Sequence, residues 1–92
     1  MIIWKVIYSK EAIDYLSKLP IKIRKRILDK IKFFHLQENP LKYAKKLTNS
    51  NFGSYRFRIG NYRAIFEIDD IGNIKILIIL IIKHRKDIYR KF

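Results

Sequence analysis

The chain has 92 residues, which is enough for one domain with a single hydrophobic core and too few for a second. Hydrophobic residues make up 49%, which argues against disorder, and the absence of cysteine excludes a disulfide framework and a thiolate metal site. Twenty-one Lys and Arg against eight Asp and Glu give a net charge of +13, which favours nucleic acid, an acidic protein or an anionic membrane as partner. A lysine-rich, AT-biased genome explains many of the lysines, but it does not explain why the arginines cluster in 56–63 and 83–90.

The first half of the chain predicts one strand and two helices. Residues 2–8 are β-branched and aromatic, which is typical of a strand. Ser9 is a suitable N-cap for a helix that runs to about Leu19 on an apolar stripe. Pro20 separates it from a second helix, roughly 20–38, with one apolar and one strongly basic face. That basic face is compatible with RNA binding and equally with a solvated surface.

The second half predicts a loop and three strands. Residues 38–53 are rich in Asn, Pro, Ser and Gly and indicate a loop. Residues 54–68 have the pattern of a β-hairpin, and 69–73 turn the chain into a further strand. That strand, 74–82, is apolar on both faces, so we place it inside the sheet. Residues 83–92 close the chain as a short helical or irregular tail.

The order of these elements predicts an α+β fold: an N-terminal strand, a helical hairpin and a three-stranded antiparallel meander. We expect one mixed or antiparallel sheet with the helices on one face, and a single domain over residues 1–92. The longest apolar run, 76–82, is far shorter than the roughly 20 residues that cross a bilayer, and no signal peptide is apparent at the N-terminus. We therefore expect a soluble, cytoplasmic protein without a membrane partner.

The hairpin places like charges side by side. With Gly60 and Asn61 as a two-residue turn, Arg58 lies opposite Arg63, and period-two alternation puts Arg56 on the same face. Like charges directly opposite each other destabilise a sheet. Replacing either of the paired arginines is therefore expected to leave stability unchanged or to raise it by about a few tenths of a kcal/mol.

Basic groups are expected to meet at one end of the sheet, because the last strand runs antiparallel to the strand that begins at residue 62. The end of the last strand then lies beside the start of that strand. The residues that meet there are Arg58, Arg63, Lys83, His84 and Arg85. Such a cluster suits metal-free phosphodiester chemistry, because RNA supplies its own nucleophile and arginine matches the charge that develops on phosphorus. His84 is able to move a proton near neutral pH, and Tyr89 to stack on a base or to assist that transfer. Taken singly, each residue also has an ordinary structural explanation. Two histidines and no cysteine make a zinc site improbable.

Two segments, "YRFRIGNYR" and "HRKDIY", together with the order of the elements, resemble the RelE/ParE superfamily of bacterial and archaeal toxins, particularly its RelE-like branch. The resemblance implies a cofactor-free and metal-independent endoribonuclease, an mRNA interferase. Such a toxin enters the ribosomal A site and cleaves mRNA to a 2′,3′-cyclic phosphate, which inhibits translation. The resemblance also implies a RelB-like acidic antitoxin that wraps the toxin.

Site residues follow from this resemblance position by position. The catalytic candidates are Arg58, Arg63, His84, Arg85 and Tyr89. The RNA-binding candidates are Arg56, Lys83 and Lys86. Well-studied RelE toxins have lysines where Arg56 and Arg58 stand, and arginine remains protonated, so His84 becomes the first candidate for the general base. A ParE-like toxin that binds DNA gyrase without hydrolysis, and an inactive relative that only binds, are the alternatives.

Overall fold

The computed structural model describes residues 2–48 and 53–87. Its elements in chain order are β1 (Ile3–Tyr8), α1 (Lys10–Ser17), α2 (Ile21–His35), a 3₁₀ turn η1 (Pro40–Tyr43), β2 (Ala44–Lys46), β3 (Tyr55–Ile59), β4 (Tyr62–Ile71) and β5 (Ile74–His84). Residues 85–87 continue from β5 as a helical turn. The predicted strands and helices are all present.

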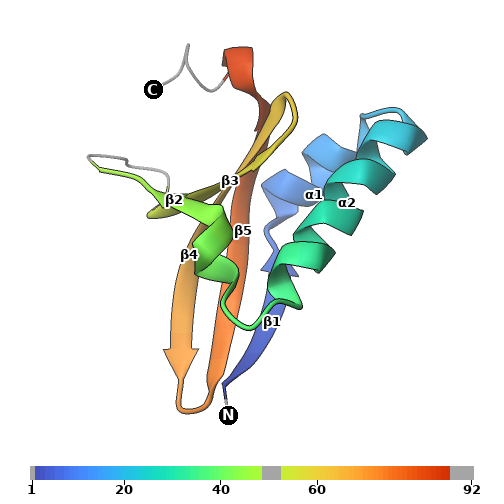
Figure 1. The fold of residues 1–92 in the computed structure, drawn as a ribbon. Coiled ribbons are helices and arrows are strands. Elements are labelled where there is room, and N and C mark those ends of the chain that lie inside the picture. The colour runs from blue at the N-terminus through green and yellow to red at the C-terminus, as the bar shows by residue number, and fades with distance from the viewer. Residues whose placement is uncertain (1, 49–52, 88–92) are drawn as a thin grey trace.

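The strands form one sheet in the order β1-β5-β4-β3-β2 (Figure 1). β1 runs parallel to β5, and every other neighbouring pair is antiparallel. β5 has a strand on each side, as its two apolar faces indicate. Both helices lie on the same side of the sheet (Figure 1). The α+β fold with a helical hairpin on one sheet face is therefore confirmed.

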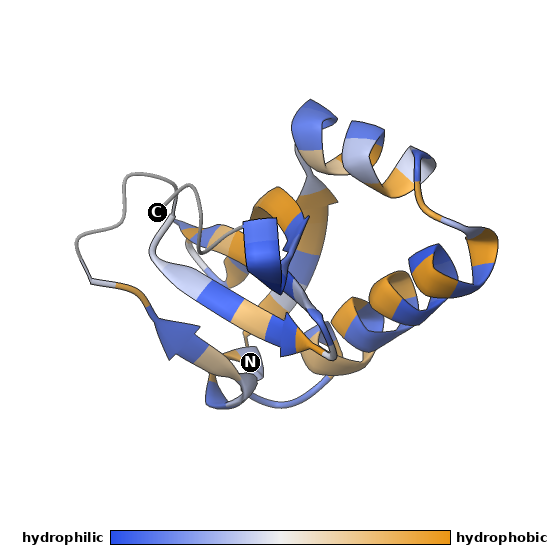
Figure 2. Cartoon of the chain, turned by 90° about the horizontal axis from the view of Figure 1, so that it is seen from above, coloured by the Kyte–Doolittle hydropathy of each residue, from blue (hydrophilic) through white to orange (hydrophobic). Residues whose placement is uncertain are grey.

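The core lies between the helices and the sheet, and local signals position both layers. Ser9 caps α1, because its Oγ accepts the N–H of Ala12 at 3.0 Å. Aromatic rings from both layers meet, with Phe57 of β3 4.7 Å from Phe34 of α2 and 4.4 Å from Phe66 of β4 between ring centroids. Hydrophilic and hydrophobic residues alternate along the strands (Figure 2). One face of the sheet therefore belongs to the core and the other is left open by the helices.

The predicted loop over 38–53 is wrong at residues 44–46, which form β2 at the edge of the sheet. β2 pairs antiparallel with β3, with Lys45 opposite Arg56. The preceding 3₁₀ turn η1 is capped by Asn39, whose side chain accepts the N–H of Leu41 at 3.1 Å. A strand of three residues has too little alternation to show a pattern, and its conformation comes from pairing with β3.

The β4–β5 hairpin is longer than predicted. β4 extends to Ile71, so the turn expected over 69–73 is reduced to Gly72, at φ +62°, and the residue after it. A bulge interrupts the ladder between Ile65 and Phe66, whose partners on β5 are Ile81 and Ile79. The bulge leaves one extra residue on β5, which bends the strand locally.

Candidate nucleic-acid interface

A row of cationic residues crosses three strands at one end of the sheet. Arg58 of β3 pairs with Arg63 of β4, which in turn pairs with Lys83 of β5. The next row along β3 contains Arg56, opposite Lys45 of β2. The residues that alternate with these on β3 and β4 belong to the core under the helices. The predicted register and the shared open face of the three hairpin arginines are therefore confirmed.

Arg63 differs from the other members of this row in its burial. Only 4% of its surface is exposed, whereas Arg58 is an exposed residue. Nη1 of Arg63 donates to the carbonyl oxygens of Gly60 and Tyr62, both at 2.9 Å, and its Nε is buried without a partner among the described residues. The guanidinium thus holds the hairpin turn, so we now expect replacement of Arg63 to cost stability, although like-charge repulsion alone predicts no cost.

The hairpin turn is also joined to the segment that follows β5. Gly60 adopts φ +58°, a left-handed conformation that glycine tolerates without a steric cost. The carbonyl of Asn61 accepts the backbone N–H of Arg85 at 2.7 Å. The turn and the end of β5 are therefore in direct contact, as the predicted convergence requires.

His84 is the last residue of β5, and its ring is held by one contact from β4 and one from the helical turn that follows β5. The imidazole meets the ring of Tyr62 edge to face, with 5.3 Å between centroids. Nδ1 accepts the backbone N–H of Lys86 at 3.2 Å. An accepting Nδ1 places the proton of the neutral imidazole on Nε2. In this arrangement His84 offers a hydrogen-bond donor, rather than a base, to a ligand at Nε2.

The remaining candidates lie in the segment after β5. Arg85 and Lys86 are exposed and belong to the helical turn over 85–87. Tyr89 lies outside the described residues. The structure thus brings seven of the eight candidates to one end of the sheet: Arg56, Arg58, Arg63, Lys83, His84, Arg85 and Lys86.

Tyr15 of α1 reaches the same end and was not predicted as a site residue. Its hydroxyl accepts the backbone N–H of His84 at 3.1 Å, and Lys83 Nζ lies 4.8 Å from the centre of its ring. Burial raises the pKa of Tyr15, so the phenol is neutral at physiological pH. In the sequence Tyr15 only adds to the apolar stripe of a helix, which gives no signal of this contact.

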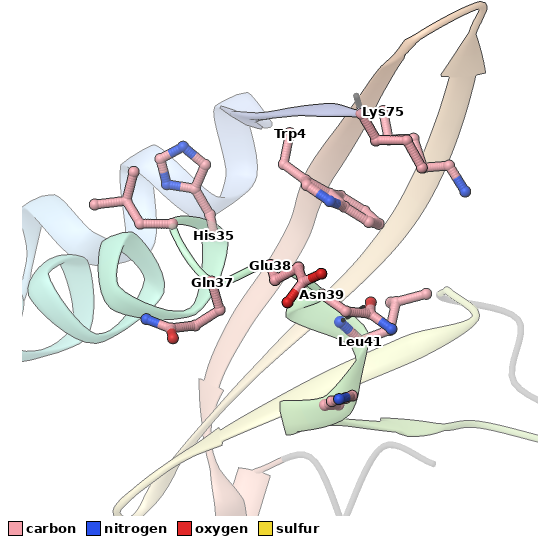
Figure 3. Close-up of a pocket in the computed structure, with 10 residues that line it drawn as sticks. Trp4, His35, Gln37, Glu38, Asn39, Leu41 and Lys75 are labelled. Atoms are coloured by element: carbon pink, nitrogen blue, oxygen red, sulfur yellow. Dashed lines mark hydrogen bonds between the residues drawn. The ribbon is translucent and has the colours of Figure 1, made fainter.

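A groove lies at the opposite end of the sheet from the basic row, near the start of β5 (Figure 3). This groove has a volume of about 1090 Å³, and Trp4, His35, Glu38 and Lys75 are among its lining residues. Lys75 Nζ lies 5.5 Å from the centre of the Trp4 ring. His35 therefore lies far from the basic row.

Among residues 2–48 and 53–87, no three His, Asp or Glu side chains gather as metal ligands would, and no helix has the length and hydropathy of a membrane span.

The fold and this basic end define a small α+β protein with an open, cationic sheet face. A family model described as the ParE toxin of the type II toxin–antitoxin system parDE matches residues 6–89. Toxin RelG of Mycobacterium tuberculosis is 36% identical over 88 residues, which cover 96% of this chain and 98% of RelG. The chain therefore belongs to the ParE/RelE family and is a toxin of the type II toxin–antitoxin class.

Solved structures of toxin–antitoxin complexes share the fold. A chain of the RelBE2 complex from Mycobacterium tuberculosis matches with a TM-score of 0.70 and 28% identity, over 91% of this chain and 100% of that chain. A chain of the RelB–RelE complex from Methanococcus jannaschii matches with a TM-score of 0.58 and 30% identity, over 94% and 98%. These likenesses extend along almost the whole chain, which agrees with the order of elements on which the resemblance was based.

Proposed function

We propose that the protein, acting as a single domain over residues 1–92, is a ribosome-dependent endoribonuclease of the RelE-like branch that cleaves mRNA in the A site. The observation that carries this proposal is the cationic row of Arg58, Arg63 and Lys83, with His84 next to Lys83 at the same end of the sheet. His84 pairs with Tyr62, so its side chain leaves β5 on the helix-facing side of that end. Such an array matches the phosphates of RNA and the charge that builds on phosphorus during cleavage.

Cleavage of RNA needs little covalent chemistry from the protein. The 2′-OH attacks the adjacent phosphorus in line with the leaving 5′-oxygen: the O2′–P bond forms as the P–O5′ bond breaks, the 2′-OH proton passes to water, and the 5′-oxygen takes a proton from water. The product is a 2′,3′-cyclic phosphate. Arg58 and Arg85 are exposed and supply cationic donors to the phosphate. Arg63 is turned toward the carbonyls of the hairpin turn, so it acts by holding that turn and by its charge.

His84 takes the role of a donor in this scheme. Because its Nδ1 accepts the Lys86 N–H, the Nε2–H is free to donate a hydrogen bond to a phosphate oxygen or to the leaving 5′-oxygen, which stabilises the developing charge without transfer of that proton. The role of His84 as the general base stays a separate prediction, which would need the other tautomer of the ring. Arg56, Lys83 and Lys86 add charge along the path of the RNA backbone, and Tyr89 keeps its proposed role of stacking on a base.

An acidic antitoxin is the partner that we propose. The matched structures contain RelB–RelE type complexes, and a net charge of +13 favours an acidic segment that orders on binding. Large apolar side chains are exposed on strands β1 and β4, with Ile3 at 51%, Ile7 at 50% and Ile71 at 58%. An amphipathic antitoxin segment that crosses the open face would cover these isoleucines and the basic row together.

The match to a ParE family model favours one second candidate, a toxin that binds DNA gyrase and hydrolyses nothing. A reconstituted translation system with a defined mRNA separates the two. We expect primer extension to reveal cleavage within codons at the A site, only when ribosomes are present and in the absence of divalent-metal additions beyond those of the ribosome. Intact mRNA together with gyrase trapped on plasmid DNA would refute the proposal.

A further inference from the structure

Within the described part of the chain, the end of β5 has no strand on one edge and is held there by α1. β1 ends opposite Ile79, so among residues 2–48 and 53–87 no strand pairs with residues 80–84 on that side. The N-terminus of α1 covers the start of this edge, where Ser9 Oγ donates to a β5 carbonyl at 2.6 Å. Tyr15 covers its end, because its hydroxyl accepts the backbone N–H of His84 at 3.1 Å.

Tyr15 makes two separable contacts with the candidate site. The hydroxyl acts on the backbone of β5 at His84, and the face of the ring lies 4.8 Å from Nζ of Lys83. The first contact is a hydrogen bond and the second is a cation–π interaction. A single side chain of α1 therefore contacts two consecutive residues of the basic end, although 69 positions separate Tyr15 from His84.

We propose that Tyr15 is a positioning residue, which fixes the backbone of β5 at His84 through its hydroxyl and keeps Lys83 in place through its ring. Without the hydroxyl, the His84 N–H would face an edge with no strand beside it, and the last residue of β5 would fray. The His84 ring would then leave its place against Tyr62. The effect on cleavage rests on the proposed function, whereas the effect on the His84 backbone does not.

Two variants separate the contacts. Tyr15→Phe keeps the ring and removes only the hydroxyl, and Tyr15→Leu removes both. Tyr43→Phe is the matched control, since Tyr43 also loses a phenol hydroxyl but stacks on Phe34 away from the basic row, with 5.3 Å between ring centroids. Hydrogen exchange followed by NMR in the full chain measures the result. The His84 amide is expected to exchange about five- to tenfold faster in Tyr15→Phe, with the Ile82 amide unchanged.

Single-turnover cleavage on ribosomes then measures the consequence for the site. Tyr15→Phe is expected to lower the cleavage rate by about tenfold at saturation, with the half-saturating concentration of toxin unchanged. Tyr15→Leu is expected to weaken binding to a short RNA oligonucleotide as well, because Lys83 is released. Tyr43→Phe should behave as the wild type in every assay.

The outcomes that overturn the proposal are distinct from those that overturn the proposed function. Unchanged exchange at His84, or equal acceleration of all β5 amides, would show that Tyr15 does not hold this residue specifically. Faster exchange with undiminished cleavage would show that the position of His84 does not matter. A wild-type protein that cleaves no mRNA would refute the proposed function, while the exchange experiment would still decide whether Tyr15 positions His84.

Discussion

Replacing Arg63 by alanine is expected to destabilise the protein, whereas replacing its partner Arg58 is not. The two arginines lie directly opposite each other and carry the same charge. Arg63 is 4% exposed and donates two hydrogen bonds to the hairpin turn, while Arg58 is exposed to solvent. Because the two residues carry the same charge, a difference in stability between Arg63→Ala and Arg58→Ala reports the burial and the hydrogen bonds of Arg63.

The expected magnitude for Arg63→Ala is a balance of two effects. Loss of hydrogen bonds from a charged donor costs about 1.5–3 kcal/mol. Relief of repulsion from Arg58 and Lys83 returns roughly 0.2–1 kcal/mol. The net loss is about 0.5–2.8 kcal/mol, which corresponds to a fall in Tm of about 2–22 °C for a domain of this size. Arg58→Ala is expected to stay within about 0.5 kcal/mol of the wild type.

Urea denaturation and thermal melting of both variants provide the measurement, and Arg63→Met is the control for volume. Methionine fills the space of the buried stem but donates no hydrogen bond, so it is expected to remain less stable than the wild type. Single-turnover cleavage at a temperature well below both melting points gives the second readout. Arg58→Ala is expected to lose a factor of about 10²–10³ in rate with its stability intact.

Two results would refute the reasoning about Arg63, and a third would refute the proposed role of Arg58. If Arg63→Ala is as stable as the wild type, the bonds to Gly60 and Tyr62 contribute nothing. If Arg63→Met restores full stability, the guanidinium is needed only as a filler. Equal cleavage by the wild type and Arg58→Ala would remove Arg58 from the proposed phosphate contacts.

Three further predictions concern the hydrogen bond donated by His84, the stability of the protein at alkaline pH, and the glycines of the two hairpin turns. His84→Gln, which retains a donor, is expected to cleave faster than His84→Ala; equal loss in single-turnover assays would contradict the donor role. Burial raises the pKa of Tyr8 from 10.0 to about 12. The unfolded chain therefore releases this proton first, and the free energy of unfolding should fall as pH rises between these values; urea titrations of Tyr8→Phe should lack this part of the fall. Gly60→Ala and Gly72→Ala should each cost about 1–2 kcal/mol, because φ is +58° and +62°; only the Gly60 variant should also lower cleavage, and equal activities would separate the turn from the site.

The register of the β3–β4 hairpin was predictable from the sequence because two local signals agree. A Gly-Asn pair fixes the turn, and alternation of apolar and polar residues fixes the faces, so the pairing of Arg58 with Arg63 follows. The convergence of His84 and Arg85 on this hairpin followed from the antiparallel return of an apolar strand. Such features depend on residues close in sequence or on a simple topology.

Other features depend on contacts between distant parts of the chain and gave no local signal. β2 becomes a strand only because β3 offers it an edge. The burial of Arg63 depends on where two turn carbonyls point, and period-two alternation does not specify that. Tyr15 has the spacing of a core residue in its helix, so the sequence indicates only that its ring is packed. Its hydroxyl accepts the backbone N–H of His84 because β1 ends before this part of β5 and leaves that N–H available.

The parallel pairing of β1 with β5 determines when, during synthesis, the sheet is able to form. Ile3 pairs with Ile74 and Tyr8 with Ile79, so the first strand made has no neighbour in the sheet until the last has been translated. Contacts that close so long a stretch of chain also form slowly. The same β5 carries Lys83 and His84, so the basic end of the sheet is completed only after β5 has been made. A growing chain thus lacks this basic surface until β5 has left the ribosome.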